Sequence, residues 1–585
     1  MRRACDRLAV PISSKTMTER NLMRVCALIG LSLAALGILA VWRATLASYS
    51  PLPFWDQWER IGSDQILSRI FDPHNEHRLA VPSLFFLGDV ALFGGRQVFL
   101  LLAIQTVQAM HAGLMIGLVR QAGLRGTDLF GAAALVVALM FAGVQIENFY
   151  WGFQISFVLV YLLATVCFAC AALRVDDRRC DLVAGVAGAA AVFAMSNGLF
   201  VLPIAVAAAL LMGAPGRRIS VLIAFAALSW AFYLRDYHPM TSADPAGALE
   251  QPLNTIYYAL VYLGGPLGGT FGGLIGNLGG NPLHTSAALG LSGLLAGVAA
   301  GLAVIMWRKN GARLALLGVM TLCTLSAGTT AAGRWQFGTE QALASRYATP
   351  ALLFWTSLAL LIWSFREELP RPAWRWASWV FLAGTPLTAG VLLASAPAWT
   401  AHARTHGDQL RTAESAVVTG TFDAQALASL YPDPQKVLDQ SKILRERRLS
   451  VFTRREAAWV GQPLEFLNLS SVETCIGAFD ARDTLATGSG EVASALHASG
   501  WAWMTEERRP PRLILFVGDG GTVVGVAYTG FDRPDVRAAI PNVGAARVGW
   551  SGHANVFWIN DPMTAYAVGY KGLARRAVIC RIGAQ

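Results

Sequence analysis

Apolar stretches of about 20 residues recur along this chain between residues 22 and 397. A helix needs about 20 apolar residues to cross a bilayer, and only helices and closed barrels can satisfy their backbone polar groups in lipid. Charged residues make up 14% of the chain and hydrophobic residues 54%, unlike a soluble protein of this length. The recurrence therefore predicts a polytopic α-helical membrane protein with about eleven spans, at 22–44, 97–119, 128–146, 153–174, 181–196, 198–214, 218–234, 286–307, 312–332, 347–365 and 374–397.

Two further apolar stretches, 79–95 and 253–283, do not fit as single crossings, because each would move a basic loop to the opposite side of the membrane. We expect interfacial, re-entrant or hairpin helices there. The second stretch holds a run of glycines from Gly264 to Gly280. Close packing at a helix crossing and a re-entrant element that lines a lipid path are two interpretations of this run.

The placement of basic residues predicts the orientation. The net charge is +10, but Lys and Arg gather in residues 1–21 and in short loops such as 174–179, 217–218 and 308–313. Such loops mark the cytoplasmic side of a membrane, so no nucleic-acid partner is expected. With a cytoplasmic segment 1–21 and eleven spans in a membrane domain 22–400, the tail lies on the outer side. In a bacterium this is an inner (cytoplasmic) membrane protein with a periplasmic C-terminal domain.

The polar tail divides into two parts. Residues 401–458 have helical periodicity and predict a periplasmic linker or stalk. Residues 459–585 show short strand-like runs between turn signals and predict an antiparallel β-sandwich. Cys475 and Cys580 are the only cysteines of the tail, so we expect a disulfide between them in an oxidising compartment. The tail tryptophans suit either the sandwich core or a glycan-binding surface.

Ionisable side chains gather in the first outer loop, residues 45–96. Carboxylates and imidazoles beside a bilayer are costly unless they face water, a substrate or one another, so they indicate a functional site. Asp56 is the hardest to explain structurally, because it lies between aromatic residues directly after the first span. The candidate catalytic residues are Asp56, Asp72, His74, Glu76 and His77.

Other outer loops carry polar and aromatic residues that can converge on the same cavity. The candidate binding residues are Trp55, Trp58 and Arg78 of the first loop, Glu147, Asn148, Trp151 and Gln154 after the third span, and Arg334, Arg346 and Tyr347 between the spans 312–332 and 347–365. Each type also has a structural interpretation. Tryptophans form belts at membrane interfaces, and arginines at span ends snorkel to the headgroups. Two histidines at i, i+3 could bind metal but match no zinc signature.

An acidic residue directly after the first span, followed by interfacial helices and many further spans, resembles the GT-C superfamily of integral-membrane glycosyltransferases. The resemblance covers roughly residues 20–400. It implies transfer of a sugar from a polyprenyl-phosphate-type lipid donor to a cell-envelope glycan or lipid acceptor, with inversion at the anomeric carbon. Two further pairs of segments are similar to recurring segments of uncharacterised bacterial proteins of this type: Glu147-Asn148 with 151–154, and Gly333-Arg334 with Ser345-Arg346-Tyr347.

The resemblance also implies roles for the candidate residues. Asp56 would be the base for the acceptor hydroxyl, with Glu76 and Asp72 as reserves, and His74 or His77 would orient acceptor or phosphate. Arginines would hold the leaving phosphate, and tryptophans would stack on sugar rings. The loop has no Asp-x-Asp or Glu-x-Asp pair, which puts a metal-dependent mechanism in doubt. No cofactor is firmly expected, and Mg²⁺ or Mn²⁺ at Asp56 is the alternative.

Two other classes of function stay open. A transporter, flippase or polymerase-type protein that handles lipid-linked glycans would also have many spans, but the sequence shows neither a convincing internal repeat nor a charge at the centre of a span. A non-enzymatic membrane scaffold would explain the outer domain but not the converging acidic and basic loops. The sequence favours a membrane enzyme whose partners are membrane lipids, a lipid-linked sugar donor and a glycan or lipid acceptor.

Overall fold

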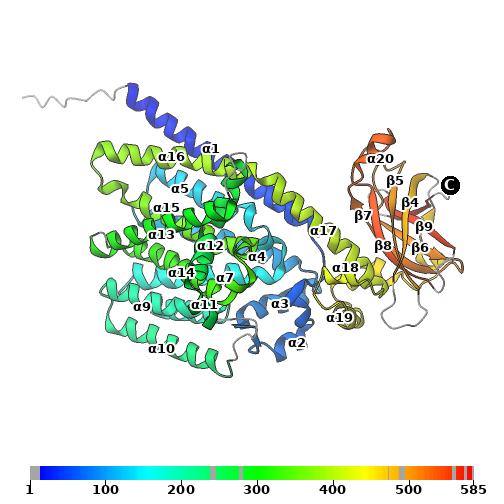
Figure 1. Cartoon of the computed structure of the whole chain (residues 1–585), viewed down its shortest axis with the longest axis horizontal. Helices are drawn as coiled ribbons and strands as arrows, with labels where there is room; N and C mark the ends of the chain where they lie inside the picture. Colours follow the sequence, from blue (N-terminus) through cyan, green and yellow to red (C-terminus); the bar gives the residue numbers. More distant parts are fainter. Residues whose placement is uncertain are drawn as a thin grey trace, which may run out of the picture.

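A computed structural model describes residues 14–237, 245–275, 281–307, 309–471, 474–485, 494–556, 562–571 and 576–582. The chain forms a helical bundle, a helical linker and a C-terminal β-sheet (Figure 1). The long helix α17 (Ala396–Thr419) leads from the bundle to the sheet.

In the described part of the chain, nine helical segments are long and apolar enough to cross a membrane. They coincide with nine of the eleven predicted spans. Sequences 181–196 and 198–214 instead form α8 (Arg178–Val192) and α9 (Val201–Leu211), which have 15 and 11 residues and fall short of the crossing length. The nine segments are α1 (Ser14–Ala47), α4 (Val98–Gln121), α5 (Gly126–Met140), α7 (Ile155–Leu173), α10 (Gly216–Leu234), α13 (Pro282–Met306), α14 (Gly311–Arg334), α15 (Ala348–Ser364) and α16 (Arg371–Ala394), which continues into α17.

The two apolar stretches that do not fit as crossings are helices. α3 (Ala80–Phe93) has 14 residues, too few to cross. α12 (Pro252–Ile275) packs against α13 at very close range, because a Cβ atom added to Gly264 would lie 1.9 Å from the Ser286 carbonyl oxygen. This contact favours the helix-crossing interpretation of the glycines; residues 276–280 of the run lie outside the described residues. Short helices complete the bundle: α2 (Ser63–Ser68), α6 (Glu147–Tyr150) and α11 (Pro245–Glu250).

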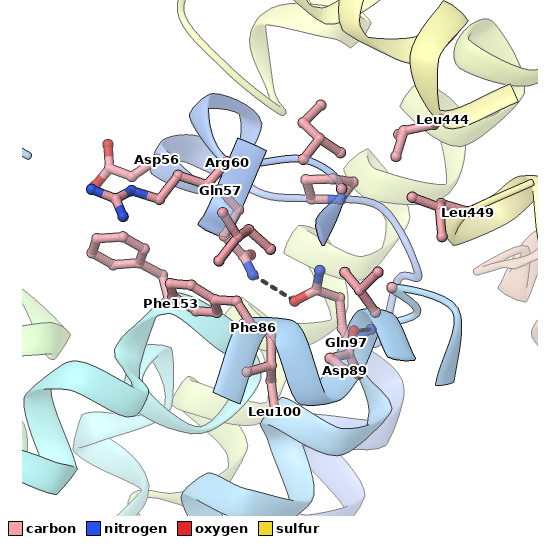
Figure 2. A pocket seen from close by; sticks show the side chains of 16 residues that line it. Asp56, Gln57, Arg60, Phe86, Asp89, Gln97, Leu100, Phe153, Leu444 and Leu449 are labelled. Atoms are coloured by element: carbon pink, nitrogen blue, oxygen red, sulfur yellow. Dashed lines mark hydrogen bonds between the residues drawn. The ribbon is translucent and has the colours of Figure 1, made fainter. Parts of the chain in front are cut away.

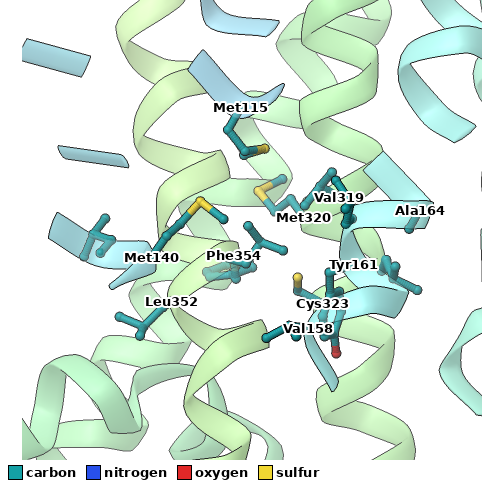
Figure 3. Packing of buried hydrophobic residues seen from close by; sticks show 14 of the residues in the cluster. Met115, Met140, Val158, Tyr161, Ala164, Val319, Met320, Cys323, Leu352 and Phe354 are labelled. Atoms are coloured by element: carbon teal, nitrogen blue, oxygen red, sulfur yellow. The ribbon is translucent and has the colours of Figure 1, made fainter. Parts of the chain in front are cut away.

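Large apolar side chains fill the centre of the bundle (Figure 3). Met115, Met140, Tyr161, Met320 and Phe354 come from five different helices, and each is at most 4% exposed. Lipid tails are as apolar as these side chains, so their contribution is van der Waals packing rather than removal from water. This packing fixes the helix ends from which the loops with the candidate residues emerge.

The tail contains one eight-stranded sheet. Its strand order is β3–β10–β9–β6–β7–β8–β5–β4, and all neighbouring strands are antiparallel except β3 and β10. We expected two facing sheets, but the described strands form a single curved sheet, a half-barrel. The strands are β3 (Ser470–Ser471), β4 (Cys475–Leu485), β5 (Ser494–Met504), β6 (Leu513–Gly518), β7 (Val523–Phe531), β8 (Gly549–Val556), β9 (Met563–Lys571) and β10 (Arg576–Arg581), with α20 (Pro534–Ala539) between β7 and β8.

Both faces of this sheet are covered without a second sheet. Leu515 on one face of β6 belongs to the same apolar core as Val417 of α17. Phe516 on the opposite face packs edge-on against Trp550, with ring centroids 5.7 Å apart. A layer of helices thus covers one face, and the curl of the sheet covers the other, which is why the sandwich prediction was wrong about the second layer.

The predicted disulfide between Cys475 and Cys580 is confirmed. Cys475 lies in β4 at one edge of the sheet, and Cys580 lies in β10, one strand from the other edge. Their Cα atoms are 6.1 Å apart although 105 positions separate them in sequence. The bridge therefore ties the two ends of the sheet together.

The predicted linker packs against the first outer loop. It consists of most of α17, α18 (Ala424–Ala428), α19 (Pro434–Glu446) and short turns. Trp58 of the loop is fully buried in the core that also contains Leu444 of the linker. The Ser450 hydroxyl donates to the Pro51 carbonyl at 2.6 Å. This docking brings the tail next to the candidate site.

Candidate functional site

A tight hairpin presents the two histidines of the first loop. β1 (Pro73–His74) pairs with β2 (His77–Arg78), which places His74 opposite His77. Asn75 in the turn has φ +52°. Asn adopts this left-handed conformation more readily than most residues, so it suits a two-residue hairpin turn.

Asp56 and Glu59 flank His74. They lie one turn apart on the 3-10 helix η1 (Trp55–Glu59). His74 Nε2 is 3.7 Å from Asp56 Oδ2, and His74 Nδ1 is 3.3 Å from Glu59 Oε2. Burial would lower the pKa of His74, but the two carboxylates outweigh it and raise this pKa to about 8. The His74 hydrogen bond in turn lowers the pKa of Glu59 far below its usual value. At pH 7 an imidazolium is therefore held between two carboxylates.

Glu76 connects the hairpin to Arg334, which lies at the end of α14. Glu76 Oε1 lies 3.5 Å from His77 Nε2 and 3.9 Å from Arg334 Nη2. Burial lowers the pKa of His77, and His77 Nδ1 accepts the Ser196 amide at 3.3 Å. Glu76 Oε2 is buried and has no hydrogen-bond partner within the described residues. An unpartnered buried carboxylate oxygen is costly in a purely structural position, so it points to a ligand or water.

Glu147 and Asn148 hold Arg346. The Arg346 backbone amide and guanidinium both donate to the Glu147 carboxylate, each at 3.2 Å. The Asn148 side-chain amide donates to the Arg346 carbonyl at 3.0 Å and to the Thr349 hydroxyl at 2.7 Å. The guanidinium lies over the Tyr347 ring, 5.2 Å from its centroid. Two predicted binding residues therefore position a third.

The three tryptophans of the predicted site differ in exposure. Trp58 is fully buried, and Trp151 is 6% exposed, with its indole N–H on the Phe54 carbonyl at 3.1 Å. Trp55 is 43% exposed and is the one of the three with a face available to a sugar ring. Gln154 is fully buried, and neither atom of its amide has a partner in the described part of the chain.

Arg78 and Asp72 lie apart from these clusters. The buried Arg78 guanidinium donates to the carbonyl oxygens of Phe71 at 2.6 Å, Tyr233 at 2.8 Å and Arg235. It anchors the first loop to the end of α10, so phosphate binding by Arg78 is not favoured. The Asp72 side chain is exposed to solvent, which makes it a poor general base.

The structure thus unites residues from four segments: 54–78, 147–154, 196–197 and 334–347. No protein-family model and no curated protein matches this chain. The chemistry of the site has to follow from its side chains.

Three residues of the site escape prediction from sequence. Tyr431 Oη donates to Glu59 Oε1 at 2.9 Å, and Lys436 Nζ donates to the same oxygen at 3.1 Å. Glu59 follows Trp58 in the aromatic and acidic segment of the loop, which was a usable signal. The Pro432-Asp433-Pro434 turn marks the start of α19 but carries no sign of a contact with residue 59.

A small pocket lies beside Asp56 (Figure 2). Asp56 and Arg60 lie at one end, Phe153 lines the wall and Leu444 of the linker lies at the other end. The first loop and the linker therefore share a pocket that reaches the principal candidate base.

A divalent cation at Asp56 stays a prediction. Within the described residues, no group of three or more His, Cys, Asp or Glu side chains is arranged to hold a metal ion. We therefore derive no step through Mg²⁺ or Mn²⁺.

Proposed function

We propose that this protein is an integral-membrane glycosyltransferase of GT-C type. It would transfer a sugar from a polyprenyl-phosphate-type lipid donor to a glycan or lipid acceptor on the periplasmic face of a bacterial inner membrane. The proposal is carried by one observation: the acidic first loop meets the arginines between α14 and α15, as in the ion pair of Glu76 with Arg334. Acidic and basic side chains from distant parts of the chain thus lie close together, which is what a base and a phosphate ligand of one site would require.

The disulfide supports an outer location for this end. Disulfides persist in oxidising compartments such as the periplasm, and the linker that leads to the disulfide-bonded sheet packs on the first loop. Nine spans and eleven spans are both odd numbers, so either count leaves the tail on the side opposite to the N-terminus. Buried arginines such as Arg218, which binds Asp181 and four backbone carbonyls, belong to the loops predicted as cytoplasmic.

Asp56 is the proposed base. The acceptor hydroxyl oxygen attacks the anomeric carbon while its proton passes to the Asp56 carboxylate. The bond between the anomeric carbon and the phosphate oxygen breaks, and its electron pair leaves with the lipid phosphate. Attack from the face opposite the leaving group inverts the anomeric carbon. The His74 imidazolium lies 3.7 Å from the Asp56 carboxylate, a charge–charge contact that is longer than a hydrogen bond.

Arg334 and Arg346 are the proposed phosphate ligands. Negative charge grows on the phosphate as the glycosidic bond breaks, so fixed cations nearby lower the barrier. An arginine fork can hold two phosphate oxygens. Glu147 and Asn148 fix Arg346 before the donor arrives, which avoids reorganisation during the reaction. Trp55 is the proposed platform for a sugar ring.

The decisive test measures transfer of label from a panel of radiolabelled polyprenyl-phosphate sugars in membranes that hold equal amounts of wild-type or variant protein. We expect transfer by wild type and a decrease of about a hundredfold in Asp56→Asn, as loss of a general base predicts. Asp519→Asn is the control, because Asp519 is an exposed carboxylate in the turn between β6 and β7 and is not part of the first loop. Unchanged transfer by Asp56→Asn would move the base to Glu76. Absence of transfer from every donor would favour lipid-linked glycan transport over catalysis.

A further inference from the structure

One carboxylate links the linker to the candidate base. Glu59 uses its two oxygens for two distant parts of the chain: Oε2 faces His74 at 3.3 Å, and Oε1 accepts from Tyr431 and Lys436 of the linker. His74 in turn reaches Asp56. A continuous chain of polar contacts therefore runs from α19 to the proposed base.

The linker also holds the backbone next to the base. The Trp55 amide donates to the Leu430 carbonyl at 2.7 Å. Trp55 has φ +48°, a left-handed conformation that bulky side chains rarely adopt unless the surroundings impose it. The residue directly before Asp56 is thus held in an unusual conformation by a hydrogen bond to the linker.

We propose that the linker is part of the catalytic site, with Lys436 and Tyr431 fixing Glu59, and Glu59 positioning the His74 imidazole beside Asp56. Glu59, Tyr431 and Lys436 are positioning residues, since none of them needs to touch a substrate. As a statement about catalysis this rests on the proposed glycosyl transfer, but the effect on His74 can be measured without it.

An ordinary surface ion pair is the competing explanation for Lys436 and Glu59, and such pairs contribute little. The two explanations differ in what they predict for His74. The charged groups that face His74 are Asp56 and Glu59 from η1 and His77 from the opposite strand. Removing the Glu59 charge leaves the buried imidazole with one carboxylate, which lowers the pKa of His74. Removing the Lys436 charge leaves the Glu59 carboxylate less neutralised, which raises the pKa of His74.

The test follows the titration of His74 by NMR in the full-length protein labelled at histidine and held in detergent, with the resonance assigned from a His74→Gln variant. We expect Glu59→Gln to lower the midpoint by about one pH unit or more, and Lys436→Met to raise it by roughly half a unit. Lys436→Arg should restore the wild-type midpoint. Lys442→Met is the matched control, because Lys442 lies on the same helix, is exposed and pairs with Asp439.

A His74 midpoint that is the same in Lys436→Met and in wild type would overturn the proposal, even if Glu59→Gln shifts it. The titration needs no sugar donor, so it gives an answer whether or not transfer is detected. Where transfer is detected, its decrease at high pH should move with the His74 midpoint, because the imidazolium holds Asp56. If the transfer rate falls at the same pH in all variants, the role of the linker in catalysis is rejected, but its effect on the His74 pKa is not.

Discussion

Removing the disulfide should destabilise the tail strongly. The double variant Cys475→Ala/Cys580→Ala releases a closed loop of 105 positions. Chain entropy predicts a loss of about 4.7 kcal/mol for a loop of this length. For a domain the size of residues 396–585, each kcal/mol lowers the Tm by about 2–4 °C, which gives a decrease of roughly 10–19 °C. We expect a loss of stability close to 4.7 kcal/mol, since the bridge joins opposite ends of the sheet and β4 and β10 are not paired with each other among the described strands.

The assay is proteolysis of the full-length protein in detergent at increasing temperature, with cleavage in the sheet followed on gels. Wild type treated with a reductant should become as sensitive as the double variant, and the double variant should not respond to the reductant. If the double variant resists protease to within about 2 °C of oxidised wild type, the ends of the sheet are held by packing alone, and the entropic reasoning is refuted.

Three further predictions concern the loops around the site. Arg78→Met removes hydrogen bonds from a buried cation to backbone carbonyls, including that of Tyr233, and should lower the free energy of unfolding by about 2–4 kcal/mol, seen as a lower Tm in detergent. Asn148→Ala frees the Arg346 carbonyl and should slow transfer roughly ten- to a hundredfold; an unchanged rate at saturating donor would contradict the positioning role. The pKa of His74 is raised from 6.5 to about 8, so its stabilisation is complete below about pH 6.5 and is lost as pH rises through about 8. Thermal unfolding should therefore show about 2 kcal/mol more stability at pH 6 than at pH 9, a difference that His74→Gln removes.

The sequence was sufficient for features that depend on local composition. Apolar length identified nine helical segments that are long and apolar enough to cross a membrane, whereas at two further predicted spans the helices α8 and α9 have only 15 and 11 residues. The disulfide could be predicted because the tail contains only Cys475 and Cys580. The single sheet could not be predicted, because a strand that is buried on both faces has the same sequence pattern whether a second sheet or a helix such as α17 packs on it.

The site could be predicted only as a set of residue types at one end of the bundle. Glu147 and Arg346 were both identified, but their contact spans 199 positions and has no local signal. The carbonyl contacts of Arg78 could not be predicted, because an arginine that caps backbone carbonyls and one that binds phosphate look alike in sequence. Glu59 and Lys436 were missed because their contact depends on how the linker folds back over the loop.

That fold-back has a consequence for biosynthesis. Glu59 lies near the start of the chain, and Lys436 follows it by 377 positions. At about 5–20 residues per second, roughly 20–75 s of synthesis separate the two residues. During this time the first loop has been synthesised, while the linker helices that share a core with Trp58 have not. We expect a chain truncated before residue 401 to leave Trp58 without the linker core and Glu59 without Lys436, so this part of the molecule is complete only once the linker has been made.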